Sequence, residues 1–279
     1  VTFGSPPAVY FIEHKEGGNN TSVRLLALTD ALTNPQFQSF DLTVPAYGPP
    51  GDPPQAGTGS RVETFDARFW NVAYRNGSLW ATHHVNSARA LARWYEIRMN
   101  GWPKSGDNPI LVQSGNIDPG PAVWTFFSAI GADAKGNAAM VFARSAVDEP
   151  YTMATAWRAS FDPLGQFRPA ETQQAAVGPY TGGRWGDYGA VEPDPARPGR
   201  FWAIQEYAIN NSWRVWIAPV DVEGCAPDLN KDGVLDLFDF LEFQNLFLEE
   251  DAAADCEANG VFDLFDFLCY QNSFVQGCE

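Results

Sequence analysis

The sequence predicts a mainly β protein that ends in a small helical module. Up to residue 222, short apolar runs are broken by Gly, Pro and Asn with almost no helical periodicity, which is typical of an all-β region. After residue 222, an offset of 27 residues relates two acidic segments, and each segment is followed by a stretch that suits a helix. We therefore expect two domains, 1–222 and 223–279.

The β region is organised in units of three expected strands. In the first unit, an Asn76-Gly77 pair, which favours a tight hairpin, joins two of the strands. The units recur about every 60 residues, with strands expected at 69–74, 79–84 and 93–98, at 125–130, 139–143 and 151–157, and at 188–191, 201–206 and 213–217. This recurrence predicts the antiparallel blades of a β-propeller, with a β-sandwich as the alternative.

The N-terminus resembles a unit that is entered partway. Strands are expected at 9–13 and 22–28, and no inner strand precedes them. Because four units are few for a ring and the chain has no initiating Met, we expect it to be incomplete at the N-terminus.

The formal net charge is −16, and most of the excess lies near the C-terminus. From Cys225 onward there are thirteen Asp and Glu and one Lys. The chain lacks the Lys and Arg clusters that bind phosphates, so we expect no nucleic acid as a partner. No stretch approaches the roughly 20 apolar residues that a membrane span needs, so no span is expected either.

Two twelve-residue segments, 228–239 and 255–266, carry the same pattern of oxygen-bearing side chains. Oxygen ligands at positions 1, 3, 5, 9 and 12, a backbone carbonyl at position 7 and Gly at position 6 match the ligand order of an EF-hand, which selects calcium. The sequence therefore predicts two Ca²⁺ ions. The candidate ligands are Asp228, Asn230, Asp232, Val234, Asp236 and Asp239, and Asp255, Glu257, Asn259, Val261, Asp263 and Asp266.

Only one helix is expected with each loop, at 237–247 and 264–274, because Cys225-Ala226-Pro227 leaves no room for an incoming helix. A half EF-hand duplicated in tandem resembles the dockerin family. The opening Cys225, the closing Gly277-Cys278 and the related motifs at 243–245 and 270–272 resemble GC-type dockerins of secreted, anchored bacterial proteins. The resemblance covers about a fifth of the chain. It implies an extracellular protein whose module binds a cohesin-like partner on a scaffold or cell surface.

In the dockerin family, recognition residues lie just before the last ligand of each loop. Those positions hold Leu237, Phe238, Leu264 and Phe265 here. The helices that follow carry more apolar side chains than two short helices can bury, so we expect these four residues to contact the partner. The alternative is that they belong to the core of the module.

All four cysteines lie in this module, which indicates two disulfides and an oxidising compartment. Tandem half EF-hands pack face to face and bring the two ends of the module together. We therefore expect Cys225 to pair with Cys278 and Cys256 with Cys269, which is one of three possible connectivities.

The densest polar and aromatic cluster of the β region is 180–188, and Glu206 follows on a later strand. The segment 184–188 loosely resembles sequences of sialidase-like propellers. The resemblance implies four candidate catalytic residues: Arg184, Asp187, Tyr188 and Glu206. Glycoside hydrolysis would require two suitably spaced carboxylates. The alternatives are a site that binds a ligand or glycan, and a structural pair of Arg184 with Asp187 among core aromatics.

Other patterns give little sign of an enzyme. His83 and His84 are neighbours on an expected strand and point to opposite faces, so both cannot bind one metal ion without a bulge. No serine-hydrolase, zinc-protease, phosphate-loop or dinucleotide motif is present. We therefore expect a secreted, anchored protein whose β domain binds a ligand, glycan or protein. The alternative is a secreted carbohydrate-active enzyme, a sialidase-like glycoside hydrolase, with the same anchor.

Overall fold

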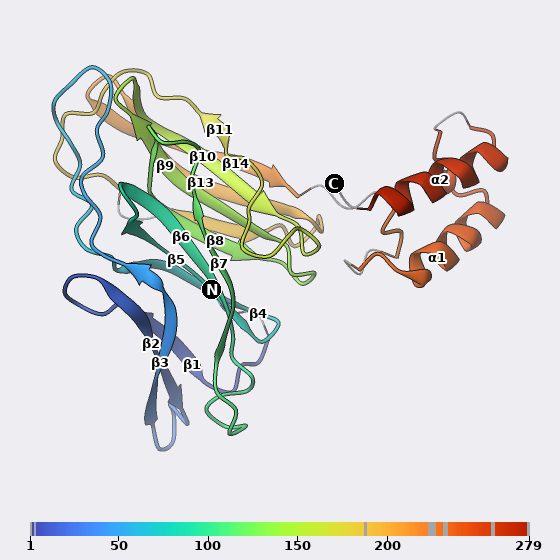
Figure 1. Ribbon diagram of the computed structural model, residues 1–279, viewed down its shortest axis with the longest axis horizontal. Helices are drawn as coiled ribbons and strands as arrows, with labels where there is room; N and C mark the ends of the chain where they lie inside the picture. The colour runs from blue at the N-terminus through green and yellow to red at the C-terminus, as the bar shows by residue number, and fades with distance from the viewer. Residues whose placement is uncertain are drawn as a thin grey trace. The chain divides into compact units, whose positions relative to one another are not determined.

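The computed structural model describes residues 2, 4–186, 189–222, 227–230, 234–257 and 260–277. Strands make up 45% of it and helices 10%, so the prediction of a mainly β protein is confirmed. Contacts between Cα atoms divide the chain into two compact units (Figure 1). We call them the β unit, Val1–Arg158 with Leu164–Val222, and the helical unit, Ala159–Pro163 with Glu223–Glu279.

The β unit contains four antiparallel sheets, each built from strands that follow one another in the chain. The first has the order β1-β2-β3, and the second has the order β4-β5-β6-β7. Their strands are Val9–Glu13, Asn20–Thr29 and Gln36–Tyr47, then Phe69–Arg75, Ser78–Asn86, Ala90–Arg98 and Ile110–Ile117.

The third sheet has the order β11-β10-β9-β8, and the fourth has the order β12-β13-β14. Their strands are Trp124–Ala132, Ala138–Ala146, Glu149–Arg158 and Glu171–Gln174 for β8 to β11, then Ala190–Pro193, Arg200–Ile209 and Ser212–Asp221 for β12 to β14. Each expected strand overlaps an observed one. Sequence analysis did not find β3, β7 and β11, each of which pairs with the strand before it at an edge of its sheet.

The hairpin between β4 and β5 turns as predicted. Asn76 and Gly77 have φ values of 49° and 80°, and Arg75 pairs with Ser78 on either side of them. A two-residue turn with both φ angles positive matches the twist of the strands that it joins, and Asn and Gly reach these angles at the least cost. Local chemistry therefore fixes the register of this pair of strands.

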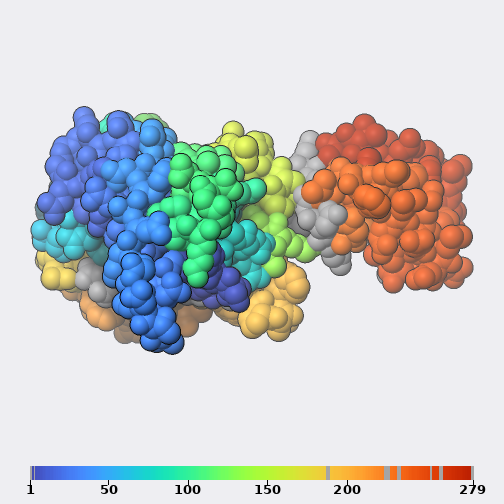
Figure 2. All heavy atoms as spheres, turned by 90° about the horizontal axis from the view of Figure 1, so that it is seen from below, coloured from blue at the N-terminus to red at the C-terminus, as the bar shows by residue number. Residues whose placement is uncertain are grey.

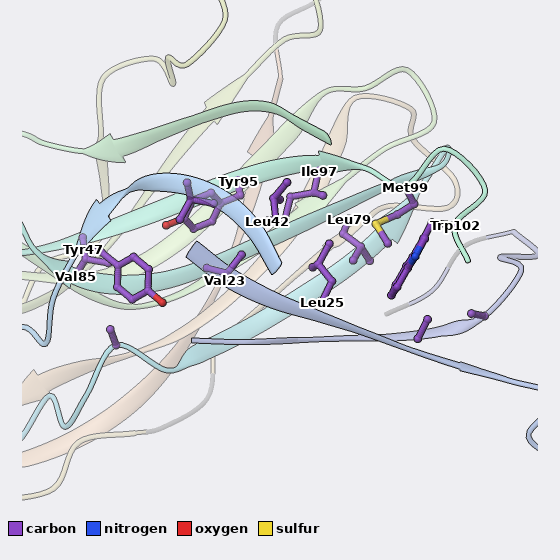
Figure 3. Packing of buried hydrophobic residues seen from close by; sticks show 14 residues of the cluster. Val23, Leu25, Leu42, Tyr47, Leu79, Val85, Tyr95, Ile97, Met99 and Trp102 are labelled. Carbon is purple, nitrogen blue, oxygen red and sulfur yellow. The ribbon is translucent and has the colours of Figure 1, made fainter. Parts of the chain in front are cut away.

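The sheets stack in chain order, and each contacts the next. Between the first two sheets, fully buried residues alternate with partly buried ones along β2, so that Val23 and Leu25 face inward. Figure 3 shows these two side chains with Leu42 of β3 beside Leu79 of β5 and Ile97 of β6, in one hydrophobic cluster. Burial of the two inner faces holds the sheets together.

The predicted β-propeller is wrong. Within the described part of the chain the four sheets form no closed barrel or ring, and the first and last sheets make no substantial contact with each other. A strand repeat encodes each sheet, but closure depends on the number of sheets and on the angle between neighbours, which the repeat does not specify. The stacked antiparallel sheets are consistent with the alternative, a β-sandwich-like fold.

Both end sheets keep apolar side chains on their outer faces. Phe11 and Phe37 of the first sheet are 45% and 68% exposed, and Trp213 and Ile217 of the last sheet are 49% and 61% exposed. In Figure 2, the N-terminal part of the chain, in blue, covers much of the visible face of the β unit. The outer face of each end sheet is therefore not covered by the other end sheet.

The helical unit contains α1, Leu237–Leu248, the short 3₁₀ helix η1, Ala252–Ala254, and α2, Leu264–Gln276. Both predicted helices are confirmed. Their core is aromatic: the rings of Phe243 and Tyr270 stack with centroids 4.2 Å apart, and Phe240 and Phe267 pack beside them. None of the described helices has the length and hydrophobicity that crossing a bilayer requires.

Candidate functional site

The first candidate calcium loop runs into α1 and is organised around the buried side chain of Asp239. Its carboxylate accepts hydrogen bonds from the backbone N–H of Asn230, at 3.2 Å, and of Asp236, at 2.9 Å. Asp236 in turn caps α1 by accepting the N–H of Phe238 at 2.8 Å. Positions 3, 9 and 12 of the loop are thus tied together, and the candidate ligand Asp232 lies outside the described residues.

The second loop repeats this arrangement residue for residue. Asp266 is buried and accepts the N–H of Glu257 at 3.3 Å and of Asp263 at 3.0 Å. These backbone hydrogen bonds, that of Asp263 above all, hold the pKa of Asp266 below its usual value and so favour the carboxylate. At the start of the loop Asp255 accepts the N–H of Gly260 at 2.7 Å, while Asn259 lies outside the described residues.

The donor set suits calcium chemically, because it consists of carboxylate, amide and carbonyl oxygens. The described residues nevertheless include no close group of three His, Cys, Asp or Glu side chains that would hold a metal ion. Asp239 and Asp266 serve as helix-capping groups here. The two calcium sites therefore stay a prediction.

The four candidate partner-binding residues lie at the start of the two helices and are exposed. Leu237 and Phe238 are 66% and 64% exposed, and Leu264 and Phe265 are 66% and 59% exposed. None of them belongs to the aromatic core cluster of the unit. Each pair thus offers apolar surface directly beside its loop.

Cys256 and Cys269 form a disulfide with their Cα atoms 5.9 Å apart. This bond links the second residue of the second loop to α2. The other predicted pair, Cys225 with Cys278, lies outside the described residues.

In the β unit, the structure brings Glu206 of β13 to the backbone of the 180–186 segment. Its carboxylate accepts the N–H of Gly186 at 2.6 Å, and a Cβ atom on Gly186 would lie 2.0 Å from the carboxyl carbon. Tyr180 donates its hydroxyl to the carbonyl oxygen of Arg184 at 2.5 Å. The candidates Asp187 and Tyr188 lie outside the described residues, so a carboxylate pair with Glu206 has no measured separation.

Arg184 contacts a residue that sequence analysis did not single out. Its guanidinium lies 5.7 Å from the ring centroid of Phe65, and that of Arg68 lies 5.6 Å from the same ring. Phe65 has a φ of 58°, in the left-handed region that bulky residues rarely adopt. No local motif marks such a residue, because the strain is imposed by its surroundings.

His83 and His84 point to opposite faces of β5, and both are fully buried. His83 donates its Nδ1–H to the carbonyl of Ala67 at 2.7 Å and accepts the hydroxyl of Tyr95 at 3.0 Å. His84 donates its Nε2–H to Thr64 at 2.7 Å and accepts the N–H of Phe127 at 3.1 Å. Burial lowers their pKa values to about 3 and about 4, so both imidazoles are neutral structural groups.

A separate pocket of about 590 Å³ opens between the end of β7 and the segment after β10. Its lining includes the charged residues Asp118, Arg144 and Arg168 and the ring of Phe167. Arg144 is paired with Glu149 at 3.0 Å, and Arg168 lies over the ring of Trp157 at 4.4 Å. The volume is in the range of sites that hold small ligands.

No family model matches the chain, and no curated protein matches it. Among solved structures, the crystal structure of a protein of unknown function from Dyadobacter fermentans DSM 18053 is similar, with 12% identity and a TM-score of 0.39. The match covers 72% of this chain and 49% of that one, so the chain spans about half the length of the protein that it matches.

Proposed function

We propose that this chain is a secreted, anchored protein. In this proposal the helical unit binds two calcium ions and docks on a cohesin-like protein of a scaffold or cell surface. The β unit, held there, binds a ligand or glycan.

The duplicated loop is the observation that carries the calcium proposal. Two segments 27 residues apart have the same oxygen-bearing positions, and Asp239 and Asp266 make equivalent hydrogen bonds across them. A single acidic loop could be a solvated turn, but two loops that share ligand order and geometry favour a common ligand. The surplus of twelve negative charges from Cys225 onward is also most simply offset by cations.

Calcium binding is tested by isothermal titration of the full chain after removal of metal with EDTA. We expect two ions per chain. The double variant Asp228→Ala with Asp255→Ala should bind none, because it removes the first ligand of each loop. Glu249→Ala with Glu250→Ala removes the same charge outside the loops and should bind two ions. Equal losses in both double variants would indicate binding by general electrostatic attraction and would contradict the proposal.

The exposed residues at the helix starts support the docking proposal. Phe238 and Phe265 are related by the 27-residue offset, and each directly precedes position 12 of its loop. Exposed aromatic side chains are frequent anchors of protein interfaces, because their burial removes a large apolar area from water.

Docking is tested by surface plasmon resonance of the full chain in calcium against a panel of immobilised cohesin modules. We expect Phe238→Ala with Phe265→Ala to abolish binding to any module that binds the unchanged chain. Leu248→Ala with Val275→Ala is the matched control, since these side chains are 81% and 78% exposed at the far helix ends. Absence of binding to every module would contradict a cohesin-like partner.

For the β unit we propose ligand or glycan binding rather than hydrolysis. The carboxylate of Glu206 already holds the N–H of Gly186, which suits a structural role better than proton transfer. A glycan array probed with the full chain tests this, with Arg184→Ala expected to lose binding and the exposed Arg214→Ala to keep it. Cleavage of a bound glycan would favour a glycoside hydrolase instead.

A further inference from the structure

Of the two repeats, only the second has cysteines that can join its loop to its own helix. The disulfide joins Cys256 to Cys269 in the second repeat, and the 27-residue offset places Leu229 and Glu242 at the same positions in the first. The hydrogen bonds that Asp239 and Asp266 accept across their loops are otherwise equivalent. The first loop therefore has no disulfide to its own helix, whereas the second loop has one.

The disulfide lies where it constrains the ligands. Cys256 directly follows Asp255, the first ligand of its loop, and Cys269 lies three residues after Asp266, the last ligand. The ring closed by the bond, with a sequence separation of 13, contains every ligand from Glu257 to Asp266. The start of the loop is thus fixed to the helix that carries its final ligand.

In the first repeat the start of the loop is held by noncovalent contacts. Leu229 is partly buried against the aromatic core cluster, where Cys256 is its counterpart from the second repeat. A hydrophobic contact can open when the loop is empty, whereas the disulfide cannot. An ion that enters the first loop must therefore order more of the chain.

We infer that the two calcium sites are unequal, with the second preorganised by its disulfide so that it binds calcium first and more tightly. This inference rests on the proposed calcium function. Closing a ring of this size removes enough chain entropy to give at most about a 150-fold difference in affinity. The difference approaches that limit only if the first loop, which has no such disulfide, is open in the absence of calcium.

The test measures each site alone in the full chain, purified under oxidising conditions and titrated calorimetrically with calcium. Asp228→Ala leaves the second site, and Asp255→Ala leaves the first. We expect the second site to bind at least ten-fold more tightly. Adding Cys256→Ala with Cys269→Ala to the Asp228→Ala chain should bring its affinity to that of the first site.

A disulfide introduced into the first repeat keeps the test decisive if removal of Cys256 and Cys269 unfolds the helical unit. Leu229→Cys with Glu242→Cys, introduced into the Asp255→Ala chain, should tighten the first site toward the affinity of the second. Equal affinities of the two single-site chains, or no gain from the transplanted disulfide once mass spectrometry shows that it has formed, would overturn the inference. No heat from either single-site chain or from the unchanged protein would instead overturn the calcium assignment, and this inference with it.

Discussion

The buried pair His83 and His84 predicts that acid destabilises the β unit well above the pH at which carboxylates titrate. Both imidazoles are fully buried, and burial lowers their pKa values to about 3 and about 4. Coulombic interactions with His84, Arg93 and His14 also disfavour the protonation of His83. The folded protein therefore keeps both residues neutral under mildly acidic conditions.

The unfolded chain does not keep these two histidines neutral, because the pKa of an unperturbed histidine is about 6.5. Below that pH the unfolded state binds two protons that the folded state does not bind, so the stability present above pH 6.5 is lost as the pH falls. The slope approaches about 1.4 kcal/mol per pH unit for each histidine and about 2.7 for the pair. It continues to about pH 4, where the folded state begins to protonate His84.

Urea denaturation followed by tryptophan fluorescence measures this slope for the β unit alone, because all ten tryptophans precede residue 223. Free energies of unfolding at several pH values between 7 and about 4.5 suffice. Burial raises the pKa of Glu192, so this carboxylate offsets part of the slope. Carboxylates whose pKa values are lowered by a partner interfere little in this window. The pKa of Asp66, for example, is held at about 2 by Arg68, so its contribution is lost only below about pH 4.

His84→Gln should lower stability at neutral pH and halve the slope, since one proton fewer distinguishes the two states. Thr82→Val is the matched control: Thr82 is a buried residue of β5 that does not titrate, so its loss should lower stability and leave the slope unchanged. A free energy of unfolding that stays constant between pH 6.5 and 4.5 would refute the assignment of His83 and His84 as buried neutral groups.

Two further substitutions, each with a control substitution, test the packing of the β unit by the same fluorescence assay. Gly186→Ala would place a Cβ atom 2.0 Å from the carboxyl carbon of Glu206 and should cost about 1–3 kcal/mol. Gly183→Ala, whose Cβ would meet nothing within 4 Å, should change stability little. Trp94→Ala removes a fully buried indole and should cost about 3–5 kcal/mol, whereas Trp202→Ala, at a site that is 43% exposed, should cost far less.

Local chemistry explains why the strands and helices could be predicted. The Asn76-Gly77 turn, the aromatic runs of the inner strands and the aspartates that cap both helices act within a few residues of where they stand. The edge strand β11 escaped prediction because Glu171–Gln174 is polar and lacks an alternating apolar pattern. The edge strand β3 does have such a pattern, from Phe40 to Val44, but it falls outside the recurring unit of three strands. Their pairing comes from the neighbouring strand.

The arrangement of the sheets could not be predicted, because it depends on contacts between residues far apart in the chain. The close approach of Gly131 to the fourth sheet is one example: a Cβ atom there would lie 2.5 Å from the carbonyl oxygen of Val191. The contact of the Phe65 ring with both Arg68 and Arg184 is another. Neither leaves a sequence pattern that a repeat of three strands could reveal.

The helical unit adds a reason why its two loops cannot be independent. A half EF-hand has one helix whose apolar face needs a partner, and here the partner is the other half: Phe243 of α1 stacks on Tyr270 of α2. These two residues are related by the same 27-residue offset as the loops, but only Tyr270 has a hydroxyl, and it donates to the carbonyl oxygen of Pro227 at 2.9 Å. Pro227 immediately precedes the first ligand of the first loop. The second helix therefore helps to hold the first loop in place, and loss of order in the second repeat would loosen both loops.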